Sequence, residues 1–250
     1  MSQKQCPGLH PLANGAYAWL APQSSWGWSN AGLIVDGEAS LLVDTLYDLE
    51  LTSEMLQKMR DAEPRAKAID TLVNTHANGD HCHGNELVTG AEIIASTASA
   101  AEMNELPPEA MAALMEAAKG MGGVGDYFLH CFGQFRFDGI RYTPPTRTFD
   151  GELNLWVGDK PVHLIEVGPA HTRGDVLVHS PADRTVFTGD ILFIEGTPVM
   201  REGPVANWID ACHRIEAMDV DHIVPAHGPI SDRQGVASVR EYLEYVRDQA

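Results

Sequence analysis

The sequence predicts an α+β protein in which two mixed β-sheets are covered by outer helices within one domain, residues 1–250. Short apolar segments of strand length alternate with longer segments whose apolar residues recur at helical spacing. No internal repeat and no Pro/Gly/Ser-rich linker divides the 250 residues. A chain of this size buries roughly three-quarters of its unfolded surface, so one layered core can form without disulfides.

The first third of the chain is expected to form strands and one helix. Asp36-Gly37 lies between two apolar runs and predicts a hairpin. Apolar residues from Leu51 to Ala62 recur at helical spacing, and Pro64 ends that helix. The expected strands are 17–20, 31–35, 40–44, 68–75 and 93–95.

Residues 98–137 differ from their surroundings and predict a helical hydrophobic insert. Pro107-Pro108-Glu109 is a good helix start, and Met111 begins an apolar face at helical spacing. A run of glycines at 120–125 is expected to break this helix and supply flexibility, before an aromatic cluster that ends at Phe137. Two interpretations stay open: an insert packed on the core, or a lid or wall for an apolar substrate, which methionine would suit by adapting its shape.

The second half returns to strands and ends in helices. The expected strands are 162–165, 176–179, 185–188 and 223–225. The expected helices cover 208–218 and 235–247.

Composition limits the class of partner. The net charge of -18 repels phosphate backbones, so we expect a small-molecule substrate and no nucleic acid. No run approaches the roughly 18 apolar residues of a membrane span, so no membrane partner is expected. The four cysteines form no CxxC pair and the N-terminus lacks an apolar signal core, so we expect free thiols in the cytoplasm. The oligomeric state does not follow from the sequence.

Candidate chemistry is concentrated in the stretch His76-Ala77-Asn78-Gly79-Asp80-His81. An expected strand runs into it, and Asn78-Gly79 is a turn dipeptide. Two histidines and one aspartate in a polar loop are the ligand types that a divalent metal requires.

Three further segments place a His or Asp at the end of an apolar strand. These are His171 after 162–165, Asp190 after 185–188 and His227 after 223–225. A small residue stands beside or near each of them, which allows the backbone to approach an ion closely. Loops of this kind on one edge of a sandwich would converge on one site.

This pattern resembles the metallo-β-lactamase superfamily, whose motif is His-x-His-x-Asp-His, then a distant His, an Asp after a strand and a late His. The resemblance extends from Tyr17 to His227 and includes Asn30-Ala31-Gly32 and Asp44-Thr45. It implies a four-layer αββα sandwich with a metal site at one edge.

The resemblance also implies the ligand sets. His76 and His171 fall on a first metal position, and Asp190 falls on the bridging position. Asp80, His81 and His227 fall on a second metal position. One or two divalent ions are expected, zinc before iron or manganese.

Asn78 departs from the family pattern, because it stands where the second histidine of the motif is usual. An amide oxygen is a poor ligand for zinc. Three alternatives follow: a single metal in the second position, two metals with the first held loosely, or an asparagine turned toward water or substrate. His83 and Cys82 are weaker candidates for a replacement ligand, because His83 lies past the loop in the start of an expected helix and no neighbouring residue orients the Cys82 thiolate.

The expected function is a metal-dependent hydrolase. A bound ion lowers the pKa of its water to about 7 and so supplies a hydroxide nucleophile, and it also polarises the substrate carbonyl. Asp80 would orient or deprotonate that water. The missing export signal argues against antibiotic resistance, and the hydrophobic insert favours an ester, lactone or acyl-thioester of a lipophilic or aromatic molecule.

Other functions stay open. A polyketide-type thioesterase or cyclase would share the fold and the chemistry. A mononuclear iron enzyme such as a sulfur dioxygenase would share the site, and a ligand-binding protein with a degenerate site would fit Asn78. Trp26, Trp28 and Trp208 are expected either to line the pocket mouth or to pack in the core.

Overall fold

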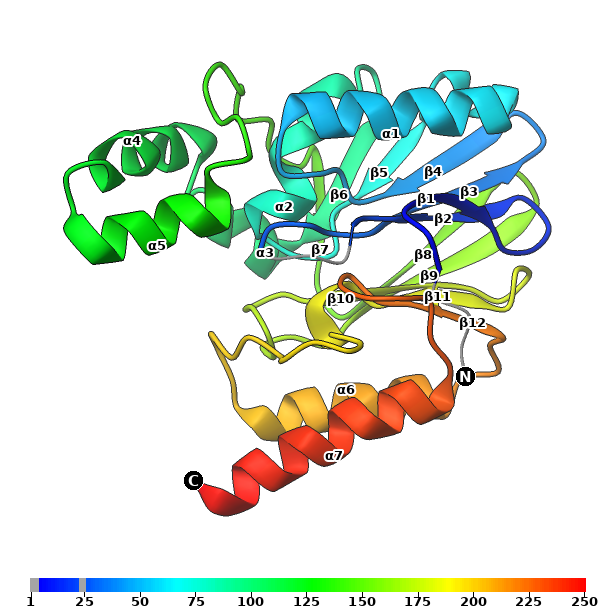
Figure 1. The fold of residues 1–250 in the computed structure, drawn as a ribbon. Helices are drawn as coiled ribbons and strands as arrows, with labels where there is room; N and C mark the ends of the chain where they lie inside the picture. Colours follow the sequence, from blue (N-terminus) through cyan, green and yellow to red (C-terminus); the bar gives the residue numbers. More distant parts are fainter. Residues whose placement is uncertain (1–4, 23–25) are drawn as a thin grey trace.

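The computed structural model describes residues 5–22 and 26–250 and has four layers (Figure 1). Helix α1 (Leu49–Ala62) lies on one side of two stacked sheets, and α6 (Val205–Glu216) and α7 (Arg233–Gln249) lie on the other. This is the αββα sandwich that the resemblance implied. Residues 1–4, which belong to the N-terminus examined for a signal core, lie outside the described part.

The first sheet has the strand order β1-β2-β3-β4-β5-β6-β7. Its strands pair antiparallel from β1 to β4 and parallel from β4 to β7, so it is mixed, as expected. The strands are β1 (Gly8–Pro11), β2 (Ala16–Leu20), β3 (Ala31–Asp36), β4 (Ala39–Val43), β5 (Thr71–Val73), β6 (Glu92–Ser96) and β7 (Arg147–Phe149).

The second sheet has the order β12-β11-β10-β9-β8. Only its pair β11 and β12 is parallel, so both strands end at the same edge of the sheet. The strands are β8 (Glu152–Val157), β9 (Lys160–Glu166), β10 (Val176–Ser180), β11 (Thr185–Phe187) and β12 (His222–Val224).

Central strands are buried on both faces, which explains their unbroken apolar sequences. In β3, Ile34 packs between the sheets, whereas Leu33 and Val35 pack under α1 with Met55. Apolar runs of this kind are expected where helices cover the outer face of a sheet. Asp48 caps α1 by accepting a hydrogen bond from the Leu51 backbone N–H at 2.9 Å.

The insert forms a helical hairpin that projects from one end of the sandwich (Figure 1). After α3 (Thr97–Glu102), α4 (Pro108–Ala118) begins at the expected prolines, and α5 (Gly122–Phe132) follows. The expected helix does end before the glycines, since α4 stops at Ala118, but three of them, Gly122, Gly123 and Gly125, lie inside the next helix, α5. A Cβ at Gly125 would come 1.9 Å from the Ala118 carbonyl oxygen, so this glycine allows α5 to pack against the end of α4.

Other boundaries also differ from the expected ones. The strand expected at 68–75 is shorter, because only Thr71–Val73 (β5) pairs in the sheet; a 3₁₀ turn, η1 (Pro64–Lys67), precedes it. Strands β1, β7 and β8 were not expected; β8 alternates half-buried and exposed residues and carries no long apolar run. The helix expected to start at His83 is the 3₁₀ turn η2 (His83–Leu87), whereas α2 (Gly79–Cys82) and η3 (Gly189–Ile191) were not expected.

None of the helices in the described part of the chain is both long and apolar enough to cross a membrane.

Candidate metal centre

Loops from both sheets meet at one edge of the sandwich. The loop after β5 carries His76 and leads into α2, which holds Asp80 and His81. In the second sheet, the parallel strands β11 and β12 run toward the same edge and are followed by Asp190 and His227. His171 lies in the loop between β9 and β10 and completes the set. The structure therefore brings together all six residues that the sequence singled out as ligands.

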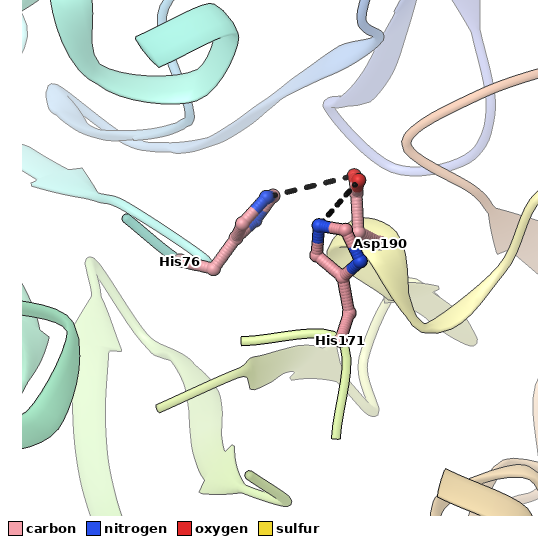
Figure 2. Close-up of side chains that lie close together, drawn as sticks. All are labelled: His76, His171 and Asp190. Carbon is pink, nitrogen blue, oxygen red and sulfur yellow. Dashed lines mark ion pairs between the residues drawn. The ribbon is translucent and has the colours of Figure 1, made fainter. Parts of the chain in front are cut away.

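Asp190 lies at the centre of this cluster. Its Oδ1 is 3.2 Å from Nε2 of His81 and 3.2 Å from Nε2 of His227, and its Oδ2 is 3.1 Å from Nε2 of His171. His76 Nε2 lies 3.7 Å from Oδ1. Figure 2 shows His76 and His171 directed at this carboxylate. Ligands of one tetrahedral zinc lie roughly 3.3 Å apart, so these separations suit atoms that share an ion.

The six residues divide into the two predicted groups. His76, His171 and Asp190 have ligand atoms within 4.8 Å of one another, and this set is the first position. The second position consists of Asp80, His81 and His227, also with ligand atoms within 4.8 Å of one another.

Each of the four histidines has a hydrogen bond on Nδ1, which leaves Nε2 for the centre of the site. His171 Nδ1 is 2.7 Å from the Val199 carbonyl oxygen, and His227 Nδ1 is 2.8 Å from that of Trp28. Such a bond fixes the ring and places the lone pair on the other nitrogen, as in most histidine ligands of metals. The remaining pairs are His76 with Thr75 Oγ1 at 3.1 Å and His81 with Asp44 Oδ2 at 2.9 Å.

Asp44 connects two of these histidines. Its carboxylate accepts hydrogen bonds from the Thr75 backbone N–H and from the Thr75 hydroxyl, both at 2.7 Å, and from His81 Nδ1. Because that hydroxyl donates to Asp44, it can accept from Nδ1–H of His76. Asp44 is 2% exposed and has a φ of 61°, a conformation that non-glycine residues seldom adopt. The surrounding hydrogen bonds hold it there.

The donor set fits a divalent ion. His76 Nε2, His81 Nε2 and Asp190 Oδ1 are buried and have no hydrogen-bond partner, although their neighbours lie close. Buried polar atoms without partners are costly, and an ion in the second position would satisfy His81 and Asp190, whereas His76 belongs to the first position. Imidazole and carboxylate ligands suit zinc, iron or manganese alike.

Electrostatics also favour a cation. Burial lowers the pKa of His76 well below its usual range, so its imidazole is neutral and ready to bind. Burial opposes charge at His81 too, but Asp80 and Asp44 raise the pKa of His81 well above its usual range. Burial acts against ionisation of Asp190, yet His227 and His76 lower the pKa of that carboxyl group. The raised pKa of His81 and the lowered pKa of Asp190 both reflect attraction between opposite charges in this cluster.

Asn78 faces the first position through its nitrogen. Its Nδ2 is 2.9 Å from His171 Nε2, and its Oδ1 accepts a hydrogen bond from Arg201 Nη1 at 3.1 Å. Arg201 was not among the expected site residues, because it lies 123 positions along the chain and belongs to no motif.

A cavity of about 480 Å³ opens onto the cluster. Asp80, His171, Asp190 and His227 line this cavity, so the candidate metal site forms its floor. Part of the lining comes from the insert. The larger apolar residues of this cavity are Trp26, Tyr47, Leu106, Met111, Phe132, Phe193 and Val199. A larger cavity of about 930 Å³ lies between β1, β2 and α1 and includes none of the six ligand-type residues.

The three tryptophans and the two alternative ligand candidates, His83 and Cys82, lie in different parts of the structure. Trp26 lines the cavity, whereas Trp208 is buried under the second sheet and donates from Nε1 to the Ile191 carbonyl oxygen at 2.9 Å. Trp28 packs on Phe135 instead. Neither His83 nor Cys82 belongs to a ligand group, because the His83 ring packs on Tyr47 and the Cys82 thiol donates to a backbone carbonyl.

A family model described as the Metallo-beta-lactamase superfamily matches residues 25–227. The chain belongs to this superfamily. The match covers all six ligand-type residues and the insert.

Solved structures of superfamily members show the same fold. A metallo-beta-lactamase from Pontibacter korlensis has a TM-score of 0.72 and 17% identity, over 94% of this chain and 98% of that one. FIM-1 from Pseudomonas aeruginosa, solved in a mono-zinc form, has a TM-score of 0.67 and 22% identity, over 98% of both chains.

The relatives found by sequence are matched over only about half of their own length. The 2,4-dinitroanisole O-demethylase subunit alpha of Nocardioides sp. (strain JS1661) is 24% identical over 78% of this chain and 51% of its own length. The hydroxyacylglutathione hydrolase of Maricaulis maris (strain MCS10) is 25% identical over 68% of this chain and 52% of its own. The superfamily member described here thus spans about half the length of these relatives. The family match and the solved structures confirm the predicted metallo-β-lactamase fold, and one of these two relatives is named as a hydrolase.

Proposed function

We propose that the protein is a metal-dependent hydrolase that cleaves an ester, lactone or acyl-thioester of a lipophilic or aromatic small molecule. One observation carries the proposal: a complete second position, Asp80, His81 and His227 beside the bridging Asp190, lies at the floor of a cavity with an apolar wall. A cytoplasmic location and the absence of a nucleic-acid partner stay predictions.

The second position would hold the ion, most simply zinc. When bound there, a divalent ion supplies an activated water and polarises a substrate carbonyl. The first position would stay free of metal, because the nitrogen of Asn78 and not its oxygen faces His171. This assignment favours the single-metal alternative among those that Asn78 left open.

The chain's own residues would orient the reaction. Asp80 Oδ2 lies 3.7 Å from His81 Nε2 and 3.8 Å from His227 Nε2, so this carboxylate can orient a water at the site and accept its proton. The Phe193 ring stacks on that of His227 with centroids 4.8 Å apart, which limits rotation of the histidine.

The apolar wall would bind the acyl or aromatic part of the substrate. Leu106 and Met111 come from the insert, and Phe132 at the end of α5 packs edge-to-face on Trp26, with centroids 6.4 Å apart. Leu106 and Trp26 are each about half exposed at 49% and 48%, so the apolar surface continues to the rim. A lipophilic group would cover it.

The test is hydrolysis of 4-nitrophenyl esters of increasing acyl length, with metal analysis of the same preparation. We expect about one metal equivalent per chain, chelator-sensitive turnover and restoration by added zinc. Asp80→Asn should lower kcat by at least about 100-fold, since general-base assistance contributes that much. His163→Ala, which changes a half-buried histidine outside the site, is the control.

Two results would contradict this function. Undiminished turnover after complete metal removal would exclude a metal-dependent step. Stoichiometric binding of the esters without turnover by the zinc-loaded protein would favour the alternative of a ligand-binding member, which Asn78 motivates.

A further inference from the structure

Arg201 determines which end of the Asn78 amide faces the metal site. A guanidinium group can only donate hydrogen bonds, so the atom of Asn78 that meets it must be the oxygen. The NH₂ group is thereby directed at His171 Nε2, 2.9 Å away. His171 can accept this hydrogen bond, because its Nδ1 lies 2.7 Å from the Val199 carbonyl oxygen and carries the proton there.

This arrangement opposes a metal in the first position. An N–H group carries partial positive charge, and the Arg201 cation stands directly behind it. An ion at His171 would require the amide to turn around, which would break its hydrogen bond to Arg201. A hydrogen bond to a charged group is worth about 10- to 100-fold in an equilibrium constant, so a first-position ion should bind more weakly by at least that factor.

Arg201 itself has no carboxylate partner among the residues that the structure describes. Arg173, by contrast, is paired with Glu105 and Glu202, at 3.6 Å for the Glu202 pair. In a chain with 35 acidic and 17 basic residues, a guanidinium that lines the substrate cavity and meets only a neutral amide has unused N–H donors. Within residues 5–22 and 26–250, the Asn78 amide nitrogen meets only His171, so its second N–H is also available.

We propose that Asn78 and Arg201 replace the first metal ion with a metal-free site that binds a carboxylate of the substrate. The proposal rests on the proposed hydrolase function and specifies its substrate class: an apolar or aromatic acyl compound that also carries a carboxylate. The guanidinium fork matches a carboxylate in shape and charge, and no metal is needed to hold it. The ion in the second position then acts only on the scissile group.

The first arm of the test compares ligands that differ by one charge. Calorimetry would measure the binding of 4-hydroxybenzoate and 4-hydroxybenzamide to the zinc-loaded protein. We expect the carboxylate to bind at least about 10-fold more tightly, because charge-assisted hydrogen bonds have that strength. Arg201→Gln and Asn78→Ala should remove most of this preference. Arg147→Gln removes an exposed arginine that pairs with Glu92, and it should leave the preference unchanged.

The second arm counts metal ions. Wild type should hold one tightly bound zinc per chain, and Asn78→His should hold two, because an imidazole supplies the ligand that the amide withholds. Arg201→Gln should keep the single tight zinc while losing the carboxylate preference.

Each outcome decides between the alternatives. Equal binding of the acid and the amide would overturn the proposal, as would a preference that survives Arg201→Gln, since the zinc would then bind the carboxylate. Two tight zinc ions in wild type would overturn it too. Failure of the hydrolase function is recognised separately, because neutral 4-nitrophenyl esters would then show no metal-dependent turnover even when the carboxylate preference is present.

Discussion

Asp44 supports the second position through His81, although it lies outside the proposed ligand set. Its carboxylate receives three hydrogen bonds, two from Thr75 and one from His81. Outer partners of this kind orient the ligand ring and raise its basicity, and their loss typically weakens metal binding 10- to 100-fold. The carboxylate is therefore expected to influence affinity without touching the ion.

The first prediction follows from this arrangement. Asp44→Asn should weaken zinc binding by about 10- to 100-fold, because an amide cannot accept all three hydrogen bonds. Asparagine tolerates the positive φ of this position, so the backbone is not strained further. Competition with a chelator of known affinity measures the effect. Asp61→Asn on the exposed face of α1 is the control, and an unchanged affinity in Asp44→Asn would show that the contact has no such influence.

Protons and metal should compete for the same nitrogens, which gives a pH prediction. Burial opposes protonation of His81 and His227, but Asp80 and Asp190 raise the pKa of both above the usual 6.5. The metal-free site therefore carries protons at neutral pH that zinc must displace. Affinity should rise with pH through and above 6.5, by roughly tenfold or more per pH unit, until both rings are neutral. Chelator competition from pH 6 to 9 checks this, and an affinity independent of pH above 7 would contradict it.

The ligand-type residues could be predicted from sequence, because each follows an apolar strand and carries a recognisable side chain. Their second hydrogen bonds could not. Whether Nδ1 of His227 meets the Trp28 carbonyl oxygen depends on a contact between loops 199 positions apart. The role of Asn78 could not be predicted from the sequence for the same reason, since Arg201 from another loop sets the orientation of its amide.

At the scale of elements, the insert depends on one close contact between two helices. A Cβ at Gly125 would overlap the Ala118 carbonyl oxygen, whereas one at Gly123 would meet nothing within 4 Å. Both glycines lie inside α5, where alanine is intrinsically favoured over glycine by up to about 1 kcal/mol. The two positions should therefore respond in opposite directions to the same substitution.

A matched pair of glycine variants in α5 tests this close contact between α4 and α5. Gly125→Ala should destabilise the hairpin by about 1–3 kcal/mol, the usual cost of overpacking. Gly123→Ala should be neutral or stabilising by up to about 1 kcal/mol. Hydrogen exchange of α4 and α5 amides reports on the hairpin itself, and thermal unfolding on the whole chain. Equal protection in the two variants would mean that α5 does not approach α4 this closely.

Elements with strong periodicity or long apolar runs could be predicted, and those without could not. Helices α1, α6 and α7 each bury one apolar stripe, so their spacing is visible in the sequence. Strand β8 lies at the end of its sheet, and α5 begins with glycines that are ordinarily read as a break. In both cases tertiary packing overrides the local signal.

At the scale of the whole molecule, Asn30 joins the two sheets beside the site. Its Oδ1 accepts from the Ala21 N–H at 2.9 Å, and its Nδ2 donates to the carbonyl oxygens of Pro225 at 2.9 Å and Gly228 at 2.8 Å. These last two residues flank the His227 loop. One side chain at the start of β3 thus positions a loop of the other sheet.

We predict that Asn30→Asp breaks this connection between the two sheets. A carboxylate cannot donate to the two carbonyl groups, and it would be buried without a compensating cation. We expect a loss of unfolding free energy of about 3–5 kcal/mol, together with weaker zinc binding because the His227 loop is released. Denaturant unfolding and chelator competition on the same preparation measure both. The conservative change Ser40→Ala, a buried polar residue of β4 away from the His227 loop, should affect stability but not zinc affinity.

The position of Asp190 between histidines from both sheets has a mechanical consequence. His81 approaches this carboxylate from the first sheet, and His227 approaches it from the second. A bound ion would therefore be a cross-link between the two halves of the sandwich, formed by residues far apart in the chain. Its binding would add to the folding free energy by mass action, by about 2.7 kcal/mol at a hundredfold excess over Kd. The tolerance of the protein to heat and proteolysis would then follow the free zinc concentration around it.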